Sequence, residues 1–86
     1  MEKKKLVGTI THYFTNLGVA VVQLSDTVKK GDEISIEGAT TNIRQKIDSM
    51  QINKKPVEEA KKGQSIGLKV PDRVRENDKV YKIIAA

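Results

Sequence analysis

The chain has 86 residues, no cysteine and a formal net charge of +5 at pH 7. This length fits one small domain, and without cysteine neither a disulfide framework nor a thiolate metal cage can stabilise it. The apolar runs are too short to span a membrane, and the charged start, residues 1–5, lacks the apolar stretch of a signal peptide. We therefore expect a single domain over residues 1–86, with a flexible basic arm at residues 1–4, in the reducing setting of the cytoplasm.

Alternating Val and Ile residues predict strands rather than helices along the chain. Residues 6–13 predict a first strand, with Leu6 and Ile10 on one face and Val7 on the other. Turn residues follow, and residues 19–24 predict a neighbouring second strand.

The middle of the chain predicts a strand over residues 33–37, whose strict alternation turns Ile34 and Ile36 inward. A longer polar strand is expected from residue 41 to residue 53. Its apolar residues change phase on the way, which indicates a β-bulge near Ser49.

The last third of the chain predicts one short helical turn at residues 56–60, with its two acids near the positive end of that turn. Strands are expected at residues 65–70 and 79–83. No composition change marks a linker or a second domain.

A short pattern recurs before three of the strands, at residues 30–34 (Lys-Gly-Asp-Glu-Ile), 62–66 (Lys-Gly-Gln-Ser-Ile) and 76–80 (Glu-Asn-Asp-Lys-Val). Gly and Asn tolerate a positive φ, so Gly31, Gly63 and Asn77 each predict a tight turn into a strand. The repeated use of one turn favours a single closed sheet. The fold class we predict is all-β, a small closed six- or seven-stranded Greek-key β-barrel.

Six segments of the sequence, in this order, resemble a known family. They are residues 7–10, 18–22, 28–36, 47–52, 56–68 and 77–81. Together they resemble domain II of elongation factor Tu and its relatives over nearly the whole chain, with Asn77 where that family has Gly. Residues 7–13 (Val-Gly-Thr-Ile-Thr-His-Tyr) are also similar to the start of the C-terminal barrel of the collagenase-like peptidase family. There the barrel is an accessory to a separate catalytic domain.

The first resemblance implies RNA binding, because domain II of the elongation factors helps to hold the acceptor end of tRNA and contacts small-subunit RNA. By position, the contacting loops are residues 13–18 and 54–67. We expect a stand-alone, non-catalytic binding module linked to translation, whose partner is RNA or a ribonucleoprotein (tRNA or the ribosome). The alternative is a protein-interaction or accessory domain for a separately encoded RNA-modifying or peptidase-like enzyme.

Basic residues are the candidate RNA contacts, because neutralising phosphates releases counterions. They are Arg44 and Lys46 on one strand face, the loop lysines Lys54, Lys55, Lys61 and Lys62, and the leading lysines Lys3, Lys4 and Lys5. A merely solvated lysine surface is an equally good interpretation of the same charges.

Catalytic and cofactor chemistry has little to build on in this sequence. His12 is the only histidine, so a metal site or a catalytic triad lacks its other members. Glu58 and Glu59 are adjacent and diverge too far for paired acid-base work. No Gly-rich loop ends in Gly-Lys-Ser or Gly-Lys-Thr. We therefore expect no enzyme activity and no cofactor, metal, nucleotide or membrane partner.

Overall fold

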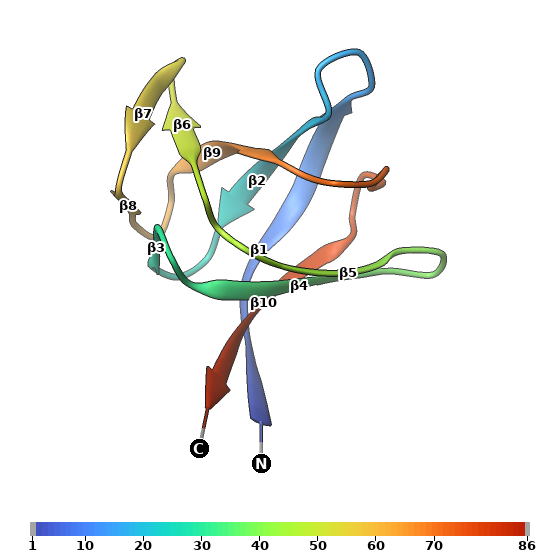
Figure 1. The fold of residues 1–86 in the computed structure, drawn as a ribbon, viewed down its shortest axis with the longest axis vertical. Helices are drawn as coiled ribbons and strands as arrows, with labels where there is room; N and C mark the ends of the chain where they lie inside the picture. The colour runs from blue at the N-terminus through green and yellow to red at the C-terminus, as the bar shows by residue number, and fades with distance from the viewer. Residues whose placement is uncertain (1, 86) are drawn as a thin grey trace.

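The computed structural model describes residues 2–85, which form ten β-strands and no helix (Figure 1). The strands are β1 (Glu2–Phe14), β2 (Val19–Leu24), β3 (Val28–Lys29), β4 (Glu33–Glu37), β5 (Asn42–Lys46), β6 (Met50–Ile52), β7 (Lys55–Val57), β8 (Glu59–Ala60), β9 (Ser65–Lys69) and β10 (Lys79–Ala85). The all-β prediction is confirmed. The predicted six or seven strands are too few, because β3, β7 and β8 are two or three residues long and show no sequence period.

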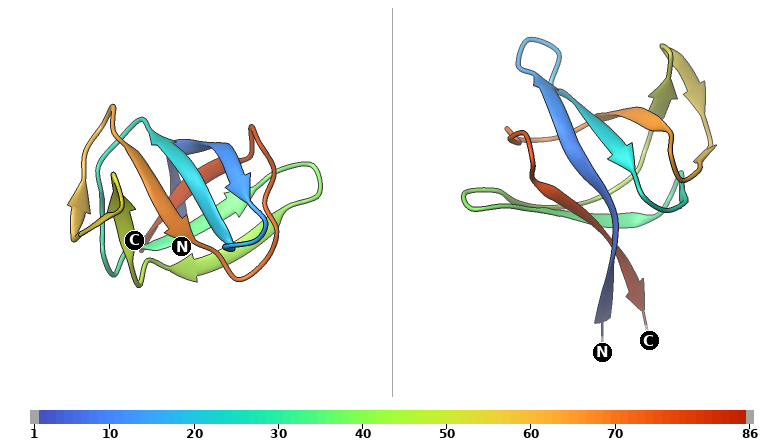
Figure 2. Two further views of the ribbon diagram at one scale, coloured as in Figure 1. Left: turned by 90° about the horizontal axis from the view of Figure 1, so that it is seen from above. Right: turned by 180° about the vertical axis from the view of Figure 1, so that it is seen from behind.

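Eight strands form one sheet in the order β5-β4-β10-β1-β2-β9-β6-β7, and β3 pairs with β8 separately. Seen from above, the strands curl around a common interior (Figure 2). The hydrogen-bonded order is nevertheless open, since β5 pairs only with β4 and β7 only with β6. The predicted closed Greek-key barrel is therefore not confirmed. The described chain contains no helix long and apolar enough to cross a membrane.

The interior is filled by Val, Ile, Leu and Met side chains. The largest fully buried ones include Ile10, Ile34, Ile36, Ile47, Met50, Ile66 and Leu68. Ile34 and Ile36 are buried, as predicted, and Ser35 between them is buried as well.

The predicted faces of β1 are wrong. Val7 and Ile10 are both fully buried, whereas Leu6 is 46% exposed. The register of β1 shifts between Leu6 and Gly8 along β10, and between Ile10 and His12 along β2. Each β-bulge inserts one extra residue and reverses the alternation of faces, so one strict period cannot describe this strand.

The long strand expected over residues 41–53 is divided in two. β5 ends at Lys46 and pairs with β4, whereas β6 begins at Met50 and pairs with β7 and β9. Residues 47–49 carry the chain from one part of the sheet to the other, so the irregularity expected near Ser49 is a break between two strands.

The predicted helical turn at residues 56–60 is also wrong, because Pro56 lies in β7 and Glu59 in β8. β7 is an edge strand. Proline is tolerated there since its missing N–H can face away from the ladder. The pairing of β7 with its hairpin partner β6, and of β8 with the distant strand β3, overrides the local helical signal.

Three turns, at residues 29–32, 61–64 and 75–78, share one hydrogen-bonding pattern. In each, the N–H of the fourth residue donates to the carbonyl of the first, at 3.0, 3.1 and 3.2 Å. The side-chain oxygen of the fourth residue accepts from the N–H of the first, at 2.8, 2.7 and 2.9 Å. The third residue has a positive φ in every case, at Gly31 (96°), Gly63 (89°) and Asn77 (74°). The predicted repeated turn is confirmed.

Candidate functional site

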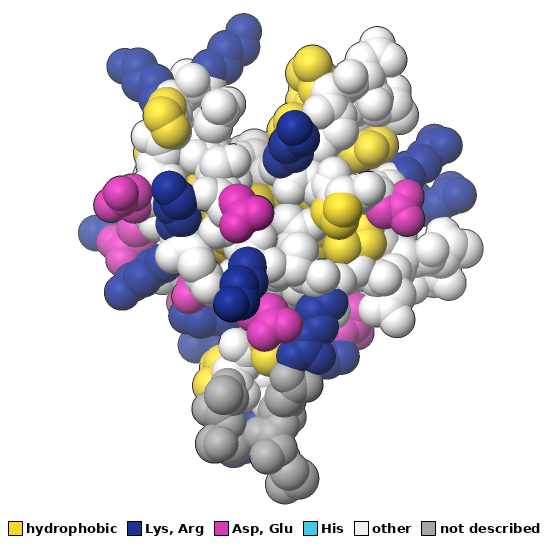
Figure 3. Space-filling model, in the orientation of Figure 1, with side chains coloured by type: hydrophobic (Ala, Val, Ile, Leu, Met, Phe, Trp, Pro, Cys, Tyr) yellow, Lys and Arg dark blue, Asp and Glu magenta, His cyan; other side chains and the backbone are white. Residues whose placement is uncertain are grey.

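The basic residues predicted to bind RNA are spread over different parts of the fold. Lys3, Lys4 and Lys5 lie on β1 near the chain ends, Arg44 and Lys46 on β5, Lys54 and Lys55 at the β6–β7 hairpin, and Lys61 and Lys62 in the turn after β8. The start of β1 and the β6–β7 hairpin stand at opposite ends of the molecule in Figure 1. Figure 3 shows Lys and Arg side chains scattered over one face with Asp and Glu between them. The fold therefore does not gather the predicted site.

The expected flexible arm at residues 1–4 is corrected for the residues that the structure describes. Residues 2–5 belong to β1 and pair with residues 82–85 of β10. The two chain ends consequently run side by side at the foot of the molecule (Figure 1). The backbone of β10 holds this segment extended, whereas its lysine content alone suggested a solvated tail. Met1 lies outside the described residues.

Two of the leading lysines are engaged with acids. Lys5 Nζ lies 2.6 Å from Asp26 Oδ2, and its hydrogen bond, followed by that of the Thr27 N–H, lowers the pKa of Asp26 below its ordinary value. Lys4 likewise donates to Glu37 and is the main reason that the pKa of this carboxyl is lowered. These ammonium groups therefore offer less charge to an outside anion than their number suggests.

Three of the other predicted residues have local structural roles. Arg44 forms an ion pair with Glu33 across the β4–β5 ladder. Lys54 has a φ of 65° and follows Asn53, whose φ is 53°. Two successive positive φ values in a two-residue connection are typical of the type I′ hairpin turn. Lys61 begins the second of the three repeated turns.

Exposed apolar side chains gather at the hairpin between β1 and β2. Phe14 is 43% exposed and Leu17 is 67% exposed. The rings of His12 and Phe14 pack edge to face, with centroids 4.4 Å apart. The hairpin is closed by hydrogen bonds from the Leu17 and Gly18 N–H groups to the Phe14 carbonyl, at 3.1 and 2.9 Å. Sequence reasoning assigned this loop to RNA and missed its apolar surface, although an aromatic and a leucine beside turn residues were a readable signal.

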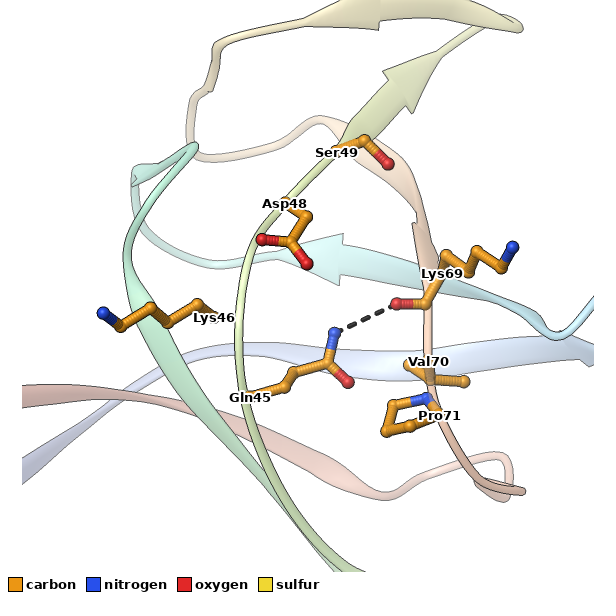
Figure 4. A pocket seen from close by; sticks show the side chains of 7 residues that line it. All are labelled: Gln45, Lys46, Asp48, Ser49, Lys69, Val70 and Pro71. Carbon is orange, nitrogen blue, oxygen red and sulfur yellow. Dashed lines mark hydrogen bonds between the residues drawn. The ribbon is translucent and has the colours of Figure 1, made fainter.

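A pocket of about 320 Å³ opens between β5 and the end of β9 (Figure 4). It is lined by Gln45, Lys46, Asp48, Ser49, Lys69, Val70 and Pro71. Only Lys46 of these was a predicted site residue. Nothing in the sequence brings β5 and β9 together, so the other members could not be found before the fold was known.

One side chain bridges this pocket. Gln45 Nε2 donates a hydrogen bond of 3.0 Å to the Lys69 carbonyl, as Figure 4 shows. The second polar atom of the same amide, Oε1, is buried and accepts no hydrogen bond. The Lys46 and Lys69 side chains extend outward on opposite sides, and the Asp48 carboxylate turns toward the space between the two strands (Figure 4). The pocket is thus framed by two cations and one anion.

Within residues 2–85 no three His, Cys, Asp or Glu side chains come together in a way that could hold a metal ion. His12 Nδ1 lies 3.9 Å from Glu76 Oε1, and both side chains are exposed.

Comparisons with known proteins point to peptidases. No protein-family model matches the chain. It is 41% identical over 80 residues to an uncharacterized protease of Methanocaldococcus jannaschii, a match that covers 92% of this chain and 20% of that protein. It is 42% identical over 83 residues to a collagenase of Porphyromonas gingivalis, covering 94% of this chain and 23% of that protein. The chain spans about one fifth of the length of these curated relatives.

A solved structure has the same fold as this chain. The C-terminal domain of a putative U32 peptidase from Geobacillus thermoleovorans superposes with a TM-score of 0.84 and 22% sequence identity, covering 91% of both chains. At this identity the likeness shows the fold alone.

These relatives overturn the main functional prediction. A translation-linked RNA-binding module is wrong, because the homologues are named protease or collagenase, and the elongation factor Tu type of domain is not shown. The collagenase-like resemblance of the first strand is the one that the comparisons support. The chain is a homologue of a domain-sized part of proteins named protease or collagenase, and it has the fold of the C-terminal domain of a U32 peptidase.

Proposed function

We propose that this chain is a non-catalytic accessory domain of the U32 peptidase family, which acts together with a catalytic domain of that family. The observation that carries the proposal is the match of more than nine tenths of the chain, at 41% and 42% identity, to only about one fifth of two proteins named for proteolysis. The remaining length of those relatives has room for the catalytic machinery. The fold likeness to a domain solved separately from its peptidase supports the same division of labour.

The curled sheet acts, in this proposal, as a barrel with one incomplete seam. The end strands of the hydrogen-bonded order are β5 and β7. The Gln45 bridge to Lys69 spans the seam on the β5 side. A nearly closed, rigid sheet suits an accessory domain because it presents its loops in fixed positions.

The apolar hairpin between β1 and β2 is the surface that docks on the catalytic domain. Leu17 and Phe14 are among the four large apolar side chains that the described residues leave exposed. An aromatic side chain with an aliphatic neighbour is a common anchor in protein interfaces. This hairpin projects from the end of the molecule opposite to the chain ends (Figure 1), where it can reach a neighbouring domain.

A domain exchange in the Porphyromonas gingivalis collagenase tests the proposal. Three forms are compared for gelatin cleavage: the intact protein, a form lacking the 83 matching residues, and a form in which this chain replaces them. We expect the deletion to reduce cleavage and the replacement to restore it. The isolated chain should cleave nothing.

A Phe14→Ser, Leu17→Ser double variant of the inserted chain is the matched control. Both side chains are exposed, so the thermal midpoint of the isolated variant should change little while restoration of cleavage is lost. Peptide cleavage by the isolated chain, or a replacement no more active than the deletion, would contradict the proposal.

A further inference from the structure

The outer edge of β5 carries backbone groups that no neighbouring strand uses. The Ile47 N–H donates to the Asp32 carbonyl at 2.9 Å, and the Gly38 N–H donates to the Thr41 carbonyl at 2.8 Å. In an antiparallel ladder, hydrogen-bonded and non-hydrogen-bonded pairs alternate. Lys46, which stands opposite Glu33, therefore directs its N–H and C=O away from β4.

The backbone of Lys69 faces the same space from the other side. The Val70 N–H donates to the Gly18 carbonyl at 3.0 Å, so by the same alternation the backbone of Lys69 turns away from β2. β6 covers β9 only at Gly67 and Leu68. Both strand edges consequently open on the pocket drawn in Figure 4.

The Gln45 side chain and its hydrogen bond limit the width of the gap between these edges. Paired strands stand about 4.8 Å apart. Between the Gln45 backbone and the Lys69 carbonyl lie a glutamine side chain, about 5 Å when extended, and a hydrogen bond of 3.0 Å. These lengths set an upper limit of roughly 8 Å on the separation, below the two spacings of about 9.6 Å that an inserted strand would need, so the two edges must move apart to admit it.

The Gln45 bridge is a weak closure. A single hydrogen bond contributes little net stability, and a buried acceptor left without a donor costs at least as much as one such bond contributes. The Gln45 bridge forms one such hydrogen bond through Nε2 and leaves Oε1 buried without a donor. A backbone that entered the gap could replace the bridge and let the glutamine amide turn to solvent.

We propose that this pocket binds an extended peptide segment with acidic side chains, which adds as a strand to the edge of β5. Strand addition uses backbone hydrogen bonds for affinity and alternate side chains for selectivity. Lys46 and Lys69 flank the two sides, and neither takes part in an ion pair within residues 2–85. Val70 and Pro71 supply an apolar wall for the side chains that point inward. Asp48 restricts where the acidic side chains of the peptide can lie, because its carboxylate would repel an acid directly beside it.

The test follows backbone amide signals of the isolated, ¹⁵N-labelled chain by NMR. The probe is a pool of capped hexapeptides in which Glu alternates with Val, Ile, Thr or Tyr, at about 1 mM, where weak binding is measurable. We expect shifts at the Lys46 and Lys69 amides and at the Gln45 side-chain amide. A pool with N-methyl groups on every second amide should lose the effect, and a pool with Lys in place of Glu should bind at least about fivefold more weakly.

Two variants sharpen the result. Lys46→Pro removes an N–H that faces the pocket and no bond to β4, so it should abolish binding in a folded chain. Gln45→Ala removes the competing bridge and should tighten binding by about threefold or more, which is near 0.7 kcal/mol.

The proposal is overturned if the pool leaves Lys46 and Lys69 unshifted, if the N-methylated pool binds equally well, or if Gln45→Ala abolishes binding. Because the isolated chain is used, this result does not depend on the collagenase exchange, and either idea can fail alone.

Discussion

Replacing the turn glycines measures how much the stability of this fold depends on backbone geometry rather than on side-chain contacts. Gly31 has a φ of 96° and Gly63 a φ of 89°, and a Cβ added at either would meet nothing within 4 Å. The cost of Gly31→Ala or Gly63→Ala is therefore backbone strain, about 1–2 kcal/mol for an L-residue in this region. For a domain of this size, that corresponds to a thermal midpoint lower by about 4–16 °C.

Urea denaturation of the purified variants is the assay, with a slope of about 1 kcal/mol per molar urea and thus an expected midpoint loss of about 1–2 M. Gly67→Ala is the matched control, since Gly67 has no positive φ and its added Cβ would stand 3.5 Å from Val19 Cγ1, an ordinary contact. We expect the control to change stability by less than about 0.5 kcal/mol. If Gly31→Ala and Gly63→Ala lose no more stability than Gly67→Ala, the strain argument is refuted.

Three further predictions concern local geometry and charge. Lys54→Gly should raise the thermal midpoint by several degrees, because the φ of 65° at this position costs an L-residue about 1 kcal/mol; an unchanged or lower midpoint would contradict this. Gly38→Ala should cost about 2 kcal/mol in urea denaturation, since its Cβ would stand 2.0 Å from Asp78 Oδ1 and displace a buried carboxylate that closes a turn. The pKa of Glu37 is lowered in the folded chain, chiefly by Lys4. The stabilisation from the ionised Glu37 carboxylate is therefore present above about pH 4.3 and is lost as the pH falls through the lowered pKa. Glu37→Gln should therefore flatten the fall of the thermal midpoint between about pH 5 and pH 3, and identical pH profiles for variant and parent would exclude this role.

The resemblance to translation factors shows what turn and core residues can specify. The glycine and asparagine turns share one hydrogen-bonding pattern. Such turns can connect the strands of any small curled sheet, whatever its function. Such residues constrain the backbone and leave the chemistry of the surface open. The 41% and 42% identity to proteins named protease and collagenase, over 80 residues or more, supports the collagenase-like resemblance and not the translation-factor one.

The sequence by itself determined the all-β fold, the burial of Ile34 and Ile36 in β4 and the positive φ at Gly31, Gly63 and Asn77. These properties depend on side chains and backbones within a few residues of one another, so a local pattern is enough to predict them.

Only the tertiary structure decided the faces of β1, the extended state of Pro56 and the pocket bridged by Gln45. A β-bulge exists relative to a partner strand, and the proline is accommodated because β7 lies at a sheet edge. The bridge arises where two strands distant in the chain approach without pairing. Each of these features is a relation between segments that the linear sequence does not place side by side, which is why the candidate peptide site could be recognised only in the folded chain.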